Sequence, residues 1–163
     1  MESIALGNAQ QADKTIMIFT EGTILKPKSW LNLFDYKSYR PIDNCVETII
    51  TWIHSGANIV YLSSRKGKQA EGVAALLRKY GFQGSKMYYR SKGESYKDIV
   101  EKLKPSVLIE DDCKSIGGAW QMCITKVAPE IKKNINSIVV SEFGGIDHLK
   151  DRVCEILQFE LSG

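Results

Sequence analysis

The stretch TIMIFTEGTIL, residues 15–25, decides how the rest of the chain is interpreted. It opens with five largely apolar, β-favouring residues and runs into a polar turn that contains Gly22. A short, continuous apolar run bounded by turn residues is typical of a strand that is buried on both faces of a sheet. Ligands of open α/β sheets bind beyond the carboxyl ends of such strands. Residues 19–23 are therefore expected to lie where any chemistry occurs.

Apolar runs and helical stripes alternate along the rest of the chain. Short apolar runs predict further strands at residues 58–62, 86–89, 106–109 and 138–140. Apolar residues at helical spacing predict helices at residues 43–55, 70–80, 96–103 and 146–161. Strands and helices that alternate in this way specify a parallel sheet covered on both faces. The prediction is a three-layer, Rossmann-like α/β fold with a five-stranded parallel sheet and helices on both faces.

The composition fits one globular domain. A chain of 163 residues with 44% hydrophobic content is long enough for a single core. We expect that domain at residues 14–163, behind a polar, mobile leader at residues 1–13 that lacks the pattern of a signal peptide. The apolar runs are far shorter than the roughly 20 residues that span a bilayer. The protein is expected to be cytoplasmic, with no membrane or nucleic-acid partner.

Positive charge is concentrated in one part of the chain. Residues 65–104 hold eleven Lys or Arg against four Asp or Glu, although the net charge of the whole chain is only +3. A basic flank beside a binding edge attracts phosphate-bearing ligands. The same charges also fit ordinary solvated helix faces, because several lie opposite apolar helix stripes.

Residues 16–25 resemble the first motif of the haloacid dehalogenase superfamily of phosphohydrolases. That motif reads apolar strand, Asp, any residue, Asp, Gly, Thr. Gly22 and Thr23 match it, and Glu21 falls at the second acidic position. Phe19 stands where the family keeps its nucleophilic aspartate, and a phenyl ring can neither attack phosphorus nor hold a cation. The resemblance implies the family's fold, with a short aromatic flap at residues 26–41 in place of a cap domain.

The second and third motifs of the resemblance concern phosphate binding. Ser63, with Ser64 as the alternative, falls where the family places a hydroxyl that binds the phosphoryl group. Lys97, with Lys92 as the alternative, falls where the family places a lysine that neutralises negative charge in the transition state. Together with the backbone amides of Gly22 and Thr23, these groups would form a phosphate cradle.

The fourth motif is acidic. Glu110, Asp111 and Asp112 directly follow an apolar run, and adjacent carboxylates are best tolerated where a cation lies between them. In the family such acids hold Mg²⁺. The resemblance therefore implies Asp111 as a metal ligand supported by Glu110 and Asp112, whereas an acidic turn that caps the next segment is the alternative. Mg²⁺ binding is expected to be weak, because position 19 lacks a carboxylate.

Two functions follow from these residues, and the choice between them stays open. One is a Mg²⁺-dependent phosphohydrolase of a small, possibly nucleotide-like, phosphorylated metabolite, with Glu21 as the general acid or base. The other is a catalytically inactive module that binds a phosphorylated ligand or a protein partner in a regulatory role. Cys113 is a poor replacement nucleophile, because neighbouring carboxylates should raise its pKa and keep it protonated.

Overall fold

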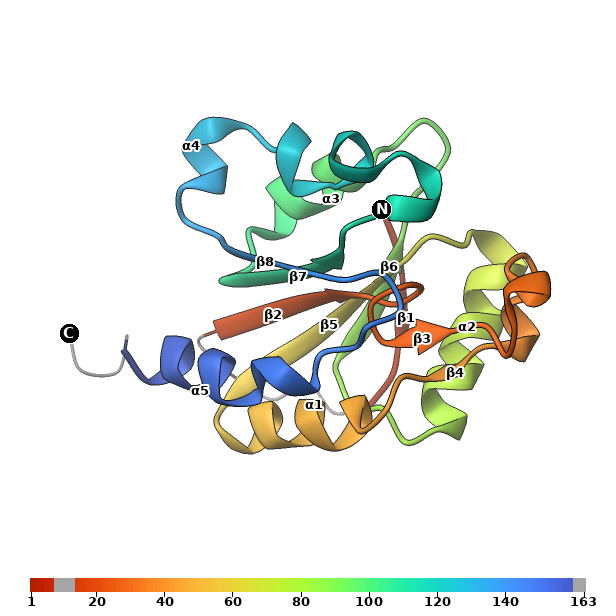
Figure 1. Ribbon diagram of the computed structural model, residues 1–163. Helices are drawn as coiled ribbons and strands as arrows, with labels where there is room; N and C mark the ends of the chain where they lie inside the picture. Colours follow the sequence, from red (N-terminus) through yellow and green to blue (C-terminus); the bar gives the residue numbers. More distant parts are fainter. Residues whose placement is uncertain (8–13, 160–163) are drawn as a thin grey trace.

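The computed structural model describes residues 1–7 and 14–159, which build an α/β fold around a six-stranded sheet. The strand order is β1-β6-β5-β2-β7-β8, which places β2 at the centre (Figure 1). Its strands are β1 (Glu2–Ala5), β2 (Lys14–Phe19), β5 (Ala57–Ser63), β6 (Lys86–Tyr89), β7 (Val107–Asp111) and β8 (Asn136–Val140). Strands β6, β5, β2, β7 and β8 pair in parallel, which confirms the predicted five-stranded parallel sheet.

Helices cover both faces of the sheet, as predicted for a three-layer fold. Helices α1 (Cys45–His54), α2 (Gly67–Lys79) and α5 (Lys150–Phe159) lie against one face, and α3 (Tyr96–Leu103) and the short α4 (Pro129–Lys132) lie on the other (Figure 1). Successive residues of a strand point to opposite faces. In β2, Ile16 and Ile18 therefore pack in the core under α1 and α2, while Met17 packs in the core under α3. None of the described helices is long and apolar enough to cross a bilayer.

The amino-terminal residues differ from the sequence-based expectation. Residues 2–5 were expected in a leader outside the domain, but they form β1, which pairs antiparallel with β6 at the edge of the sheet. Its residues are mostly exposed, so the stretch lacks the apolar run that marks the buried strands. The rest of the expected leader, residues 8–13, lies outside the described residues.

Helix α3 has its predicted bounds, whereas α1 and α2 begin and end one to three residues away from the predicted ranges. Helix α3 begins at a capping box in which Ser95 and Asp98 satisfy each other's free amides. At the start of α1, by contrast, the side chain of Asn44 makes no cap hydrogen bond. The predicted carboxyl-terminal helix begins as a 3₁₀ turn at Asp147–Leu149 before α5, and its predicted last residues, 160 and 161, lie outside the described part of the chain.

The aromatic flap is a long hairpin loop that folds back onto the domain. Two short strands, β3 (Leu25–Lys26) and β4 (Arg40–Pro41), close its base, and 3₁₀ turns at Trp30–Asn32 and Tyr36–Ser38 shape its tip. Tyr36 packs on α2 so closely that a Cβ at Gly72 would meet its ring. The hydroxyl of Tyr39 donates to the carbonyl of Leu33 at 2.7 Å. The flap is thus a fixed wall at the carboxyl end of the sheet.

Candidate functional site

A cavity of about 400 Å³ lies at the carboxyl ends of the parallel strands, where ligands of open α/β sheets bind. Strand ends, the flap and the loop after β7 all contribute to its lining. Of the residues predicted for the site, Glu21, Gly22, Lys97, Glu110 and Asp111 line it. Ser63 and Thr23 are fully buried beside it, and Asp112 is half-buried and is not among the lining residues. Most of the predicted site residues therefore lie around one cavity.

Phe19 ends the central strand and lines this cavity, and it is the residue that the resemblance aligns with the family's nucleophilic aspartate. Its ring contacts the ring of Tyr96 in an edge-on arrangement, with centroids 5.2 Å apart and planes at 74°. Because alternate residues share a face, Phe19 lies on the same side of the sheet as Met17, against the core under α3. Phe19 is thus a packed side chain with an aromatic partner.

Glu21 is hydrogen-bonded to the groups that the resemblance assigned to phosphate binding. Its carboxylate accepts hydrogen bonds from the hydroxyl of Ser63 at 2.7 Å and from the amide of Ser64 at 3.0 Å. The hydroxyl of Thr20 adds a third at 2.5 Å. The second-motif hydroxyl and its neighbouring amide are therefore already bonded to an internal anion. An external phosphate can reach Ser63 only after Glu21 leaves.

Gly22 and Thr23 hold the turn together. The amide of Gly22 donates to the carbonyl of Leu25 at 2.9 Å, so it is not free for an anion in this conformation. The hydroxyl of Thr23 donates to Asp111 Oδ1 at 3.3 Å, which ties the turn after β2 to the end of β7. Gly22 has a φ of +87°, and an added Cβ would lie 2.7 Å from Asp111 Oδ1. Only glycine fits this position without strain.

Glu110 has a structural environment. Its carboxylate is almost fully buried and accepts hydrogen bonds from the amides of Cys123 and Ile124, at 2.6 and 2.9 Å. Burial raises the pKa of Glu110, and the two amides partly oppose that shift. Strand β7 continues through Asp111, so Glu110 and Asp111 point to opposite faces. Glu110 therefore anchors the loop after β7, and it is not among the carboxylates that the fold gathers into one group.

Three carboxylates do gather at the edge of the cavity: Asp111, Asp112 and Glu142. Each can offer an oxygen such that the three oxygens lie within 4.8 Å of one another, and carboxylate oxygens are the ligands that Mg²⁺ prefers. Glu142 follows β8 and was not predicted. Its position two residues after a strand, at the same edge as the other acids, was the signal that could have found it.

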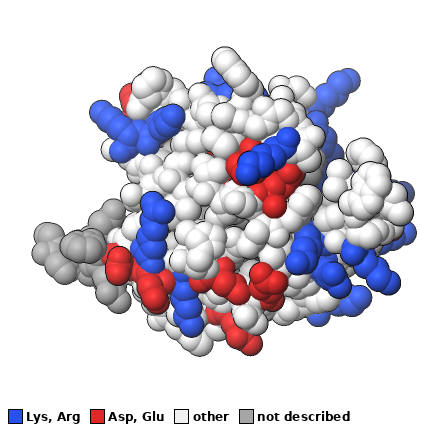
Figure 2. Space-filling view, viewed as in Figure 1, with Lys and Arg blue, Asp and Glu red and all other residues white. Residues whose placement is uncertain are grey.

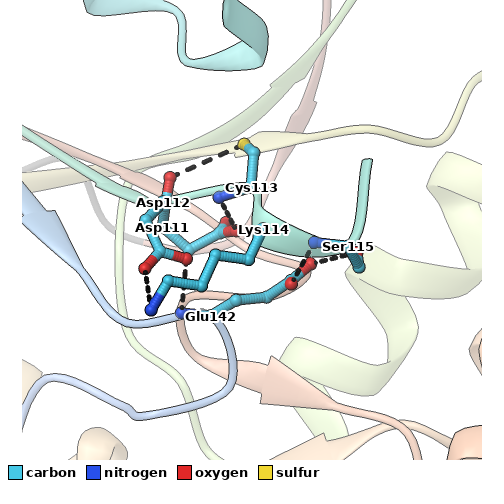
Figure 3. Close-up of polar contacts among 6 residues, drawn as sticks. All are labelled: Asp111, Asp112, Cys113, Lys114, Ser115 and Glu142. Carbon is cyan, nitrogen blue, oxygen red and sulfur yellow. Dashed lines mark hydrogen bonds and ion pairs between the residues drawn. The ribbon is translucent and has the colours of Figure 1, made fainter. Parts of the chain in front are cut away.

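Each of these three carboxylates already has a hydrogen-bond donor or cationic partner from the protein (Figure 3). Asp111 accepts from the Cys113 amide at 3.0 Å, and Glu142 accepts from both the amide and the hydroxyl of Ser115. The ammonium of Lys114 lies 3.2 Å from Asp112 Oδ2 and is 76% exposed. The three carboxylates can hold a metal ion, but the cation would compete with the ammonium of Lys114 for Asp112. Because the side chain of Lys114 is exposed, it can move into solvent and leave Asp112 to the cation.

Magnesium binding by the wild type is therefore expected to be weak, with no saturation at micromolar Mg²⁺ in calorimetry. Lys114→Ala removes the competing ammonium and should strengthen Mg²⁺ binding. Lys102→Ala, at an exposed lysine of α3 away from the cavity, is the matched control and should change nothing. Tight, micromolar binding by the wild type, or equal affinities in all three proteins, would contradict this assignment.

Cys113 is unsuited to act as a nucleophile. Burial, reinforced by the carboxylate of Asp111, raises the pKa of its thiol to about 12. The predicted direction is confirmed, although burial is the larger cause. At neutral pH the thiol stays protonated, and the thiolate is the nucleophilic form.

Asp111 should make stability depend on pH. Burial raises its pKa, with Glu142 adding to the shift, so the folded chain holds this proton to a higher pH than the unfolded chain. Stability should then fall as pH rises from the ordinary aspartate pKa through the raised one. Asp111→Asn cannot ionise and keeps partners for Thr23 and the Cys113 amide. In urea unfolding with a chelator, wild type should lose stability relative to Asp111→Asn between acidic and neutral pH.

Asp98→Asn is expected to change the pH dependence of stability in the opposite direction. The hydroxyl of Ser95 lowers the pKa of Asp98, so that carboxylate stabilises the fold above its ordinary pKa and loses the effect as pH falls. The Asp98→Asn variant should therefore lose stability at neutral pH. The same slope in both variants would show that a general charge effect, and not the local environment, sets the pH dependence.

Exposed apolar side chains stand on both sides of the cavity mouth. The flap presents Trp30, Leu31 and Phe34, and the loop after β7 presents Ile116 and Trp120, all at least 63% exposed. Phe34 and Ile116 also line the cavity. Lys and Arg side chains gather on the right of Figure 2, the side where Figure 1 shows α2 and the flap. The cavity thus opens between apolar walls with positive charge nearby.

Comparison with known proteins tests the fold. No family model and no curated protein matches the sequence. Among solved structures, a class C acid phosphatase from Bacillus anthracis with tungstate bound matches with a TM-score of 0.56 and 13% identity, over 90% of this chain and 79% of the other. A second structure of that enzyme matches with a TM-score of 0.57 and 11% identity, over 93% and 80%. Class C acid phosphatases belong to the haloacid dehalogenase superfamily, and the present chain therefore has the haloacid dehalogenase-like fold.

Proposed function

We propose that the protein is a catalytically silent haloacid dehalogenase-like module that binds a small phosphorylated ligand in the cavity. One observation carries the proposal: the strand end that would supply the nucleophile holds Phe19, packed edge-on against Tyr96. In-line attack on phosphorus needs a carboxylate at that place. Among the described residues that line the cavity, the thiol of Cys113 is protonated, and the carboxylate of Glu110 is bonded to two amides.

The internal bonding of Glu21 supports the same conclusion. A general acid must release its proton to the leaving oxygen and recover it. The carboxylate of Glu21 instead accepts three hydrogen bonds from its own domain, and these bonds hold it in the phosphate cradle. Turnover would require Glu21 to leave and a nucleophile to be supplied. Binding requires only cationic groups, of which Arg65, Arg90 and Lys97 line the cavity.

The runner-up is a Mg²⁺-dependent phosphohydrolase. The three-carboxylate group is the observation in its favour, because a cation held there could activate water as the attacking group. Asp111 would be its central ligand, with Asp112 and Glu142 beside it.

An assay of wild-type protein with and without Mg²⁺ separates the two functions. We expect negligible hydrolysis of p-nitrophenyl phosphate, together with a rise in melting temperature when phosphate monoesters are added. Sodium chloride at matched ionic strength is the control for general salt effects. Brisk hydrolysis that Asp111→Asn abolishes would overturn the silent module in favour of the hydrolase.

A further inference from the structure

Two arginines that follow neighbouring strands meet at the cavity. In the pairing of β5 with β6, Ser63 stands opposite Tyr89, so Arg65 and Arg90 lie just beyond the same edge of the sheet. Both line the cavity. Arg65 ends the stretch that resembles the second motif, whereas Arg90 belongs to none of the motifs that indicated the fold. They lie next to Ser63 and Ser64, whose donors are bonded to Glu21.

Each arginine has a buried donor without a partner. Among the described residues, the Nε atoms of Arg65 and Arg90 are the buried side-chain nitrogen or oxygen atoms that lack a hydrogen-bond partner. A buried, unsatisfied donor costs about 1–3 kcal/mol, more when it is charged. Neither guanidinium makes an ion pair within the described part of the chain. Two unsatisfied cationic donors at one cavity indicate an anionic ligand that supplies the missing acceptors.

Aromatic contacts hold Arg90 in place. Its guanidinium lies over the ring of Tyr96, with its Cζ 4.0 Å from the ring centroid, which is a cation–π contact. Phe19 in turn presents itself edge-on to Tyr96. Position 19 thus supports Tyr96, and Tyr96 supports Arg90. Phe19 therefore helps to position Arg90 through Tyr96, because a carboxylate at position 19 would leave Tyr96 without its edge contact.

Arg65 is held from the flap side. One of its terminal nitrogens donates to the carbonyl of Leu33 at 3.4 Å, and the hydroxyl of Tyr39 lies near enough to interact with the guanidinium. Both arginines are therefore oriented by neighbours that leave Nε–H unpaired. A guanidinium fixed in this way can offer Nε–H and one terminal N–H to two oxygens of the same anion.

We propose that Arg65 and Arg90 form the anion clamp of this cavity and that the ligand it takes is a phosphate group, free or as a monoester. The clamp replaces the cradle of Ser63 and its neighbouring amide, which Glu21 fills. This inference rests on the proposed function and specifies which residues carry out its binding step.

The test compares ligand affinity in matched variants of the whole chain. Melting temperature is titrated with inorganic phosphate and with phenyl phosphate, and chloride keeps the ionic strength constant. Arg90→Lys and Arg65→Lys keep the charge but lose the planar pair of donors. Ser63→Ala and Lys97→Ala probe the cradle implied by the resemblance. Arg152→Lys, at an exposed arginine of α5, is the matched control.

Wild type and Arg152→Lys should bind alike, whereas Arg90→Lys and Arg65→Lys should each lose about tenfold or more in affinity, as expected for a lost charged hydrogen bond. Phenyl phosphate that binds more tightly than inorganic phosphate would identify the monoester as the better ligand. Affinity that survives both arginine variants but falls in Ser63→Ala or Lys97→Ala would overturn the clamp and leave the proposed function standing. Wild type that binds neither probe would overturn both.

Discussion

The double variant Phe19→Asp/Glu21→Asp is expected to hydrolyse phosphate monoesters with Mg²⁺ about a hundredfold faster than the wild type, which should remain near background. Phe19→Asp supplies the missing carboxylate at the end of the central strand. Glu21→Asp shortens the side chain that now reaches the hydroxyl of Ser63 and the amide of Ser64, so both donors become available to a phosphate. Steady-state release of p-nitrophenol is the measurement.

Phe19→Asn/Glu21→Asp is the matched control, because asparagine has nearly the same shape but cannot act as the nucleophile. It should stay inactive. Phe19→Asp alone should gain less activity than the double variant, since Glu21 still fills the cradle. If the asparagine control is as active as the aspartate variant, position 19 is not where the attacking group stands, and the silent-module proposal loses its main support.

The fold could be predicted because its main signals are local. Strands β5 and β7 and most of β2 are buried on both faces and therefore appear as apolar runs, and β6 and the edge strand β8 still hold short apolar runs. The helices between them carry one apolar stripe each. Strand β1 was not predicted, because an edge strand with mostly exposed residues has no such apolar run. Its place in the sheet depends on pairing with β6, which is more than 80 residues away in sequence, and no local pattern encodes such a pairing.

The site was harder to predict, because its chemistry depends on side-chain direction. Glu110 and Asp111 are neighbours in sequence and both line the cavity, but the strand directs them to opposite faces. Glu110 accepts hydrogen bonds from two backbone amides, whereas Asp111 lies with Asp112 and Glu142. Ser63 fell at the expected place, yet its hydroxyl is bonded to Glu21. Arg90 directly follows β6 and Glu142 lies two residues after β8, so the rule that placed the other candidates at strand ends would have included them. The sequence alone could not show which hydrogen-bond partner each of these side chains has.

Gly22→Ala is expected to destabilise the protein by about 3 kcal/mol, through backbone strain and overpacking together. In a chain of this size that loss lowers the melting temperature by roughly 10 °C. Gly56→Ala is the matched control, because Gly56 also has a positive φ, +98°, but an added Cβ there meets nothing within 4 Å. It should cost only the backbone strain, about 1–2 kcal/mol.

The difference in unfolding free energy between Gly22→Ala and Gly56→Ala measures the steric overlap of the new Cβ with Asp111. A double-mutant cycle tests that assignment. Asp111→Gly removes the carboxylate atoms that lie 2.7 to 3.1 Å from the new Cβ. In Asp111→Gly, the Gly22→Ala change should therefore cost no more than Gly56→Ala does, and the cycle should give a coupling energy of about 1–2 kcal/mol. A coupling energy near zero would mean that the turn after β2 moves away from β7 to make room. The hydrogen bond from Thr23 to Asp111 would then be too weak to hold the two strand ends in the arrangement that closes one wall of the cavity.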